Sequence, residues 1–112
     1  MKPIVAMAVY KPKPDKEIDL LNALRVHVPT LRKEGFATLR PPLFLKSKES
    51  GAIIEIFEWV NHDLKMQAHD NEKVKEVWAK LAEAAEMVPL ETLSEAKTQF
   101  PNFEAMQGVV CS

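Results

Sequence analysis

The side chains best suited to acid–base chemistry stand in one apolar segment, Ile53-Ile54-Glu55-Ile56-Phe57-Glu58-Trp59-Val60. This composition predicts a β-strand, whose side chains alternate between two faces. Glu55 then falls on the face of Ile53, Phe57 and Trp59, and Glu58 falls on the face of Ile54, Ile56 and Val60. A carboxyl group enclosed by apolar side chains holds its proton to higher pH and can act as an acid or a base. Glu55 and Glu58 are therefore candidate catalytic residues, with ordinary ion pairing to Lys or Arg as the alternative for each.

Two histidines have a candidate role beside these carboxylates. His69 stands in the segment QAHDNEKV, between a short and a long predicted helix. An imidazole there could polarise a bound carbonyl or phenol or transfer a proton, and the alternative is a bond to the backbone at a helix start. His27 lies beside the apolar stripe of the first predicted helix, where a half-buried boundary position is the simpler interpretation. His69 is thus a candidate catalytic residue and His27 a candidate substrate-binding residue.

Aromatic side chains could form the wall of a cavity next to these groups. Tyr10, Phe57 and Trp59 are the candidates for contact with a substrate, and Trp59 at its strand end is the most open to that role. Trp78 recurs at helical spacing with Val74 and Leu81, which is typical of a core position. The spacing therefore assigns Trp78 to the core and the strand aromatics to a candidate pocket.

Composition and motif content exclude several classes of protein. The 112 residues carry 15 basic and 16 acidic side chains, and the formal net charge of −1 argues against binding to nucleic acid or to an anionic membrane. The three glycines lie far apart, so phosphate-binding loops are absent and no nucleotide cofactor is expected. The histidines lack metal-ligand spacing and the one cysteine, Cys111, has no intrachain partner, so neither a metal nor a disulfide is expected. The first apolar run is too short for a membrane span or a signal peptide, so we expect a cytoplasmic protein.

Alternating and helical periodicities outline the elements that must position these residues. They predict strands over residues 3–11, 43–46, 52–60 and 87–93, long helices over 16–34 and 71–86, and a short helical turn that starts near Asp63. Asp15 is the expected N-cap of the first helix, and Gly35 stands at its expected C-terminal cap. The order βαββαβ is a ferredoxin-like α+β arrangement, with a four-stranded antiparallel sheet and both helices on one face. We assign residues 1–93 to this domain and 94–112 to an extension that docks on the domain or on a partner subunit.

The first strand carries more apolar surface than one subunit can hide. Its apolar residues fall on both faces: Ile4, Val5, Met7, Val9 and Tyr10. Two helices cover only one face of a four-stranded sheet, and monomers rarely expose a large apolar patch. A second copy packed face to face would bury that patch, so a homodimer is expected.

Four segments resemble the antibiotic biosynthesis monooxygenase-type domain: KPKP, HVPTLRKEG, EIFEWV and AHDNEKVKEVWAKL. The resemblance covers roughly residues 3–93 and is closest to an uncharacterised bacterial branch with the VPTLR and FEW patterns. It implies a dimeric α+β barrel, in which two ferredoxin-like subunits close face to face. By resemblance, Trp59 and His69 match the recurring Trp and His positions of the domain. The haem-degrading branch is not matched, because the first strand, IVAMAVY, lacks the Asn that this branch uses there.

The resemblance implies a cofactor-independent monooxygenase that binds a small aromatic or quinone-like molecule in the barrel cavity. In that chemistry, His69 or one of the strand glutamates removes a proton from a phenol or an acidic carbon, and the electron-rich anion reacts with O2. Two alternatives stay open: a non-catalytic small-ligand-binding or interaction homodimer, and an isomerase or cyclase that uses the same acid–base groups without O2.

Overall fold

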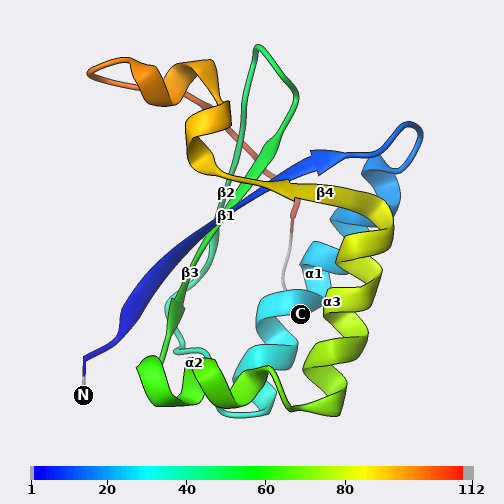
Figure 1. Cartoon of the computed structure of the whole chain (residues 1–112), viewed down its shortest axis with the longest axis vertical. Helices are drawn as coiled ribbons and strands as arrows, with labels where there is room; N and C mark the ends of the chain where they lie inside the picture. Colours follow the sequence, from blue (N-terminus) through cyan, green and yellow to red (C-terminus); the bar gives the residue numbers. More distant parts are fainter. Residues whose placement is uncertain (1, 110–112) are drawn as a thin grey trace.

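The longest strand, β1 (Ile4–Pro12), lies inside an antiparallel sheet with the strand order β4-β1-β3-β2-β5 (Figure 1). The structure is a computed structural model and describes residues 2–109. β1 pairs along most of its length with β3 (Ile53–Trp59), with Ile4 opposite Trp59 and Tyr10 opposite Ile53. The other strands are β2 (Leu43–Lys46), β4 (Ala85–Val88) and β5 (Glu104–Ala105). The predicted α+β class is confirmed, and the sheet has five strands instead of four because the C-terminal extension adds β5.

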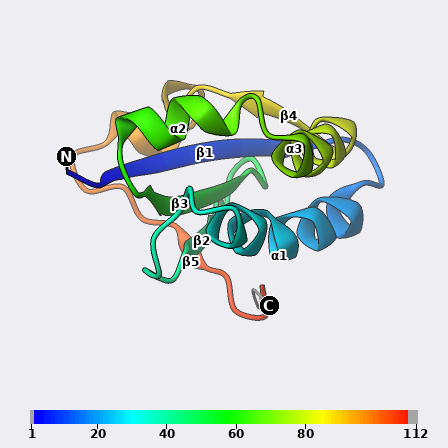
Figure 2. The same ribbon diagram turned by 90° about the horizontal axis from the view of Figure 1, so that it is seen from below.

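Two long helices, α1 (Glu17–Lys33) and α3 (Glu72–Ala84), pack against each other and cover one face of the sheet (Figure 2). Their buried residues join strand residues in two apolar clusters. The first cluster includes Leu20, Leu24, Leu81, Tyr10, Phe44 and Ile53. The second includes Val28, Leu31, Val74, Phe57 and Trp59. The space between sheet and helices that these clusters fill is called here the sheet–helix interior, and it contains the candidate site.

The two ends of α1 differ in how well the sequence predicts them. Asp15 is not the N-cap: it has a left-handed φ of 62°, and Lys16 occupies the cap position without a side-chain hydrogen bond. The tight turn after β1 imposes this conformation, which an aspartate tolerates better than most residues. Gly35 has a φ of 87° and its N–H donates to the carbonyl of Arg32, so the predicted glycine at the helix end is confirmed.

A third helix, α2 (His62–Ala68), links β3 to α3 and lies at one end of the sheet–helix interior (Figures 1 and 2). The side chain of Asn61 accepts a hydrogen bond from the backbone N–H of Leu64, and this bond caps the start of α2. Asn71 caps α3 in the same way, by accepting from the N–H groups of Lys73 and Val74. These two caps define where α2 and α3 begin.

The last predicted strand, over residues 87–93, is placed too late in the chain. The helix α3 ends at Ala84, whose carbonyl accepts a hydrogen bond from the backbone N–H of Lys13, and Ala85 already pairs with Pro12 on β1. Pro89, which has no N–H to donate, follows the end of β4. Two 3₁₀ turns come next, at Leu90–Thr92 and Ser94–Lys97. Pairing with β1 thus overrides the helical pattern that continues to residue 86.

The extension covers part of the sheet face that lies opposite the helices, called here the outer face. Ala96 and Phe103 of the extension, together with Leu93 just before it, pack there on Val9 and Ile54. β5 then pairs with the edge of β2, and Met106 and Val109 pack against the first cluster of the sheet–helix interior. The described part of the extension therefore docks on its own chain.

Another part of the outer face remains exposed. Val5, Met7 and Leu43 keep 56%, 49% and 52% of their surface accessible. The register brings them together, because Met7 and Leu43 both stand opposite Ile56, and Val5 stands opposite Glu58. Val5, Met7 and Leu43 are called here the outer patch.

A carboxylate anchors the extension to the β2–β3 turn, which makes this attachment sensitive to pH. The hydroxyl of Ser47 donates a hydrogen bond of 2.7 Å to Glu95, and this bond lowers the pKa of Glu95 below its usual 4.5. A carboxyl group with a lowered folded-state pKa stabilises the fold above its unfolded-state pKa and loses that contribution as the pH falls through the folded value. Glu95→Gln is expected to make the melting temperature fall less steeply than in wild type as the pH drops below 4.5. Glu91→Gln, in the neighbouring turn, is the control, and the same slope in Glu95→Gln as in wild type would contradict the anchor.

Candidate functional site

β3 places its two glutamates on opposite faces of the sheet, as the alternation predicts. Glu55 is completely buried on the helix side, between Ala8 on β1 and Phe44 on β2. Glu58 lies on the outer face, opposite Val5. Of the two candidate catalytic carboxylates, Glu55 is the one that enters the sheet–helix interior.

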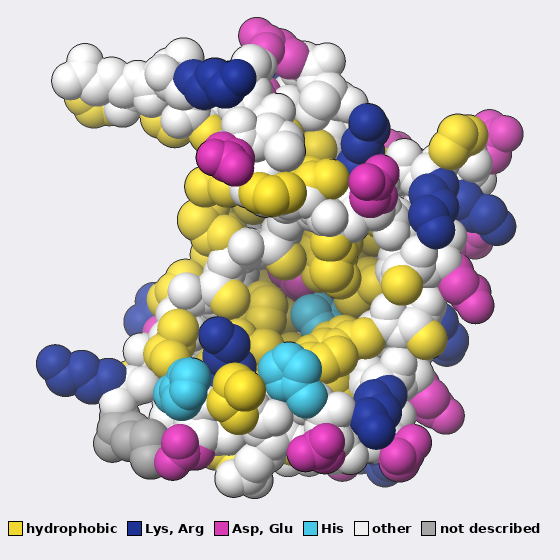
Figure 3. Space-filling view, in the orientation of Figure 1, with side chains coloured by type: hydrophobic (Ala, Val, Ile, Leu, Met, Phe, Trp, Pro, Cys, Tyr) yellow, Lys and Arg dark blue, Asp and Glu magenta, His cyan; other side chains and the backbone are white. Residues whose placement is uncertain are grey.

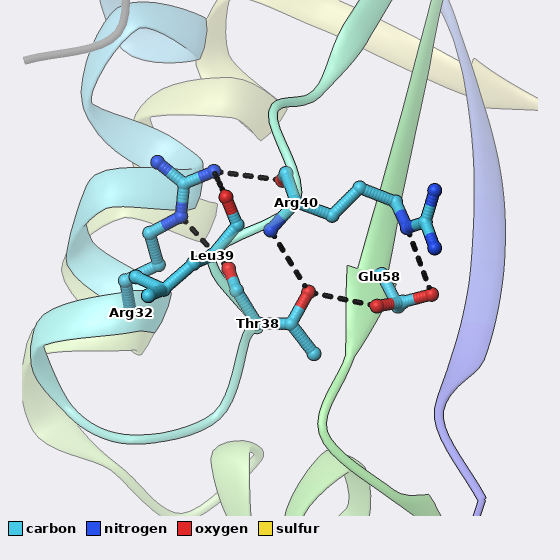
Figure 4. Close-up of polar contacts among 5 residues, drawn as sticks. All are labelled: Arg32, Thr38, Leu39, Arg40 and Glu58. Atoms are coloured by element: carbon cyan, nitrogen blue, oxygen red, sulfur yellow. Dashed lines mark hydrogen bonds and ion pairs between the residues drawn. The ribbon is translucent and has the colours of Figure 1, made fainter.

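Glu58 holds a loop in place on the outer side of β3. Its carboxylate accepts a hydrogen bond of 2.9 Å from the hydroxyl of Thr38 and one of 3.1 Å from Nε of Arg40 (Figure 4). From α1, Arg32 donates to the carbonyls of Thr38 and Arg40 and so holds the same loop from its other side. Glu58 therefore shows the ion-pairing alternative, and the strand alternation turns it to the outer face, away from the sheet–helix interior.

Four side chains from four elements form one buried hydrogen-bonded group, called here the buried quartet: Tyr10 on β1, Glu55 on β3, His27 on α1 and Trp78 on α3. The hydroxyl of Tyr10 donates to Oε1 of Glu55 at 2.8 Å. Nδ1 of His27 lies 2.9 Å from Oε2 and 3.0 Å from Oε1 of the same carboxylate. Nε1 of Trp78 donates to Nε2 of His27 at 3.0 Å. The carboxylate of Glu55 thus joins β3 to β1 through Tyr10 and to α1 through His27, and His27 extends the group to Trp78 on α3.

The donors in the quartet fix the proton on His27. An indole N–H can only donate, so Nε2 of His27 accepts from Trp78 and carries no proton. A neutral imidazole has its one proton on the other nitrogen, so Nδ1–H donates to Glu55. Since Tyr10 also donates to Glu55, both partners of this carboxyl group are donors, which selects its ionised form. The quartet therefore buries one negative charge that is satisfied by neutral donors rather than by a cation.

Tyr10 serves this group as a donor that does not ionise. Burial, and next to it the carboxylate of Glu55, raise the pKa of Tyr10 far above its usual 10.0. The phenol thus keeps its proton throughout the physiological range. Tyr10 holds Glu55 and cannot act as the base of the group.

The predicted substrate-binding aromatics lie next to the quartet. The ring of Phe57 meets the ring of His27 edge-on at 5.5 Å, and Trp59 meets Phe57 in the same way at 5.1 Å. Trp59 is only 5% exposed, so it is more enclosed than its position at a strand end suggests. Tyr10, His27, Phe57 and Trp59 therefore share one side of the sheet with Glu55.

A hollow opens into the sheet–helix interior on the face shown in Figure 3. It is lined mainly by apolar side chains, and histidine and acidic side chains are visible inside it. The hollow lies between β1 and β3 on one side and α1 and α3 on the other, with α2 below (Figures 1 and 3). Trp78 is half-buried and packs against both apolar clusters, which places it at the boundary between the interior and its surroundings.

His69 lies outside the quartet. It is exposed directly after α2, and its Nδ1 lies 3.2 Å from the carbonyls of Lys65 and Met66. Its ring packs edge-on against Trp78 at 5.1 Å. The structure thus shows the backbone-bonding alternative for His69, at the end of α2 rather than at a helix start. His69 contacts the quartet at the ring of Trp78.

Two further cavities lie away from the quartet. One, of about 460 Å³, is formed mainly by exposed residues of α1 and α3, including Asp19, Asn22, Lys80 and Glu83. The other, of about 200 Å³, lies between β4, the β2–β3 turn and the start of the extension.

Within residues 2–109, no three His, Cys, Asp or Glu side chains are grouped so that they could hold a metal ion. No helix in that range is long and apolar enough to cross a membrane. Cys111 lies outside the described residues.

Comparisons with known proteins show the fold and no more. No family model and no curated protein matches the chain. The structure is similar to that of a conserved protein from Methanosarcina mazei Go1, with a TM-score of 0.63 and 20% identity, over 79% of this chain and 88% of that one. It is also similar to Rv0793 from Mycobacterium tuberculosis, with a TM-score of 0.57 and 18% identity, over 78% of this chain and 89% of that one. These similarities support the α+β fold found here.

Sequence reasoning missed the role of Trp78 and the pairing of His27 with Glu55. Helical spacing correctly puts Trp78 on the inward side of α3 but says nothing about where its N–H points. A buried tryptophan usually finds an acceptor for that N–H, and the search for one among polar residues on the facing helix would have led to His27. The pairing of His27 with Glu55 depends on how α1 lies across β3, which no local pattern encodes.

Proposed function

We propose that the protein is a cofactor-independent monooxygenase that binds a small aromatic or quinone-like molecule in the sheet–helix interior of a homodimer. The observation that carries this proposal is the pairing of His27 with Glu55 inside an apolar interior. A neutral imidazole held by a carboxylate is a general base, because the carboxylate orients the ring and stabilises the imidazolium that forms when the ring takes a proton. The resemblance to the monooxygenase-type domain and the ferredoxin-like strand order β4-β1-β3-β2 agree with this proposal.

The chemistry assigns a separate task to each member of the group. Nε2 of His27 removes a proton from an acidic C–H or O–H of the bound substrate, and Glu55 stabilises the resulting imidazolium. Tyr10 holds Glu55, and the apolar surroundings keep water from the anion. The electron-rich anion reacts with O2, and for a substrate CH2 group the balanced outcome is a carbonyl group and one molecule of water.

A panel of anthrones and quinols tests this proposal. Oxygen consumption and product formation are measured with purified protein and compared with the same buffer without protein. Turnover by wild type and its loss in His27→Gln are the expected results. No turnover above the buffer rate across the panel would overturn the proposed oxygenation.

A second candidate is a non-catalytic homodimer that binds a small ligand. It is favoured by the hydrogen bonds of His27 itself. Nδ1 contacts Glu55 and Nε2 already accepts from Trp78, so neither ring nitrogen is available to a substrate in this structure. This candidate predicts that aromatic molecules bind without any consumption of O2. The same panel therefore separates the two functions when binding and turnover are both measured.

The outer patch supports the homodimer. Val5, Met7 and Leu43 form an exposed apolar surface on a sheet face, and the adjoining part of that face is already covered by the extension. A second copy that packs its own patch on this one buries both at once, as a twofold symmetric interface requires. The two subunits would then form a dimeric α+β barrel in the cytoplasm.

Met7→Asp is expected to convert the dimer to a monomer. The substitution puts a charge in the middle of the proposed interface, where it would be desolvated without a partner. Analytical ultracentrifugation of the wild type and the variant at equal concentration measures the change. Ile18→Asp is the matched control, because Ile18 is 75% exposed but lies on α1, away from the outer face. A monomeric wild type, or a dimer that survives Met7→Asp, would contradict this interface.

A further inference from the structure

Among the described residues, Trp78 occupies the ring nitrogen of His27 that Glu55 does not engage. Nδ1 of His27 is engaged with Glu55, so Nε2 is the nitrogen left for a substrate, and the indole N–H of Trp78 sits on it at 3.0 Å. Trp78 itself is half-buried at the boundary of the sheet–helix interior. Its outer contact is with His69, which is exposed and follows the short helix α2.

The indole N–H also determines which protonation state the quartet can adopt. An imidazolium has N–H groups at both nitrogens, and the one at Nε2 would point at the N–H of Trp78. Two donors facing each other repel, so His27 can take up a proton only when Trp78 moves away. The groups that face His27 are Glu55 from β3, with Tyr10 behind it from β1, and Trp78 from α3, with His69 behind it. None of these offers an acceptor to a proton on Nε2.

We propose that Trp78 is a displaceable cap on His27, which the O–H of a flat aromatic ligand must replace at Nε2 before the site can work. The indole is itself a flat bicyclic ring with one donor at its edge, so it marks both the shape and the hydrogen bond that the site accepts. When a phenolic molecule enters the hollow, its O–H replaces the indole N–H at Nε2 and Trp78 turns towards His69 and the outside. Unlike the indole N–H, the phenol can then give its proton to His27, which leaves an imidazolium between the carboxylate of Glu55 and the new phenolate. This inference rests on the proposed function, since the molecule that displaces Trp78 is the aromatic ligand proposed for the same site.

The test uses 2-naphthol and its methyl ether, 2-methoxynaphthalene, which have the same fused rings but differ in the O–H donor. The chain has two tryptophans, so the proton NMR spectrum contains two indole N–H signals, and Trp59→Phe identifies the one that belongs to Trp78. In wild type under argon, saturating 2-naphthol is expected to shift the Trp78 signal upfield and to speed its exchange with solvent. The methyl ether is expected to bind more weakly, because it would leave Nε2 without a donor. An unchanged Trp78 signal, no binding of 2-naphthol, or equal affinity for the two ligands would overturn the inference.

Trp78→Phe supplies the second measurement, because it keeps a ring at this position and removes only the capping N–H. The affinity of the variant for 2-naphthol, measured by calorimetry, is expected to rise about threefold to tenfold, since the ligand no longer has to break a hydrogen bond to His27. Trp59→Phe is the matched control: it also removes an indole N–H, but not one that caps His27, and its affinity is not expected to rise. Unchanged or weaker binding by Trp78→Phe would show that the tryptophan has a structural role alone.

These binding measurements are independent of the oxygenation test. If 2-naphthol displaces Trp78 and no anthrone or quinol consumes O2, the proposed oxygenation fails and the cap stands. If substrates are turned over while the Trp78 signal stays unchanged at saturation, the cap fails and the oxygenation stands.

Discussion

Glu55→Leu is expected to lower the free energy of unfolding by about 2–6 kcal/mol, because it leaves two buried donors without an acceptor at about 1–3 kcal/mol each. The leucine fits the apolar surroundings but accepts no hydrogen bond. The hydroxyl of Tyr10 and Nδ1–H of His27 then stay buried without an acceptor, at 1% and 4% exposure. Urea denaturation followed by circular dichroism measures the loss.

Two further variants make this prediction specific. Glu58→Leu, on the same strand, removes an acceptor that serves Thr38 and the largely exposed Arg40, so a loss of at most about 1–2 kcal/mol is expected. Tyr10→Phe in the Glu55→Leu background removes one stranded donor and is expected to restore about 1–2 kcal/mol. A loss as large in Glu58→Leu as in Glu55→Leu, or no recovery in the double variant, would show that the quartet does not govern stability as its hydrogen bonds indicate.

His27→Gln is expected to lower kcat for any substrate that wild type oxygenates by about 10²–10⁴-fold, the usual contribution of a general base. The glutamine amide can still donate to Glu55, so the carboxylate keeps a partner and the fold is retained. The amide has no basic nitrogen for the proton of the substrate, so kcat falls while KM changes little. Steady-state oxygen consumption measures both constants.

His69→Ala is the comparison for that experiment. His69 is exposed and its Nδ1 faces backbone carbonyls, so its loss is expected to change kcat by no more than about threefold, less than one hydrogen bond is worth. If His69→Ala instead abolishes turnover and His27→Gln does not, the base would be the histidine that the resemblance points to, and the assignment to His27 would be wrong.

The sequence predicts the fold far better than the geometry of the site. The apolar pattern of β1 and the alternation in β3 predict two of the strands and put Glu55 and Glu58 on opposite faces, because those properties depend only on neighbouring residues. Which glutamate is enclosed depends on where the helices lie, and the sequence leaves that open. The boundary of β4 is missed for a related reason, since Ala85 is drawn from a helical pattern into a strand by its pairing with Pro12.

Candidate residues are identified individually, but their partnerships are not. Tyr10, His27 and Glu55 are all recognised from their types and positions, although they are 17 to 45 residues apart and come from three different elements. What joins them is the angle at which α1 crosses the sheet, which is decided by the packing of many side chains at once. From the sequence alone, His69 is a better candidate for a catalytic base than His27, yet the structure leaves His69 exposed at the surface.

The strand order has a consequence for the order in which the chain can fold as it is synthesised. β1 is the first strand to leave the ribosome, but its two neighbours, β3 and β4, begin only at Ile53 and Ala85. Its backbone groups therefore have no partner on either side until β3 has been made, and none on the second side until β4 has been made. An unpaired apolar strand is prone to associate with other chains. The edge of β2 waits longer still, until β5 has been made. Nascent chains should therefore depend on chaperones until β4 and β5 have emerged, and a stalled chain that ends before Ala85 should be bound far more strongly than one that extends past Ala105.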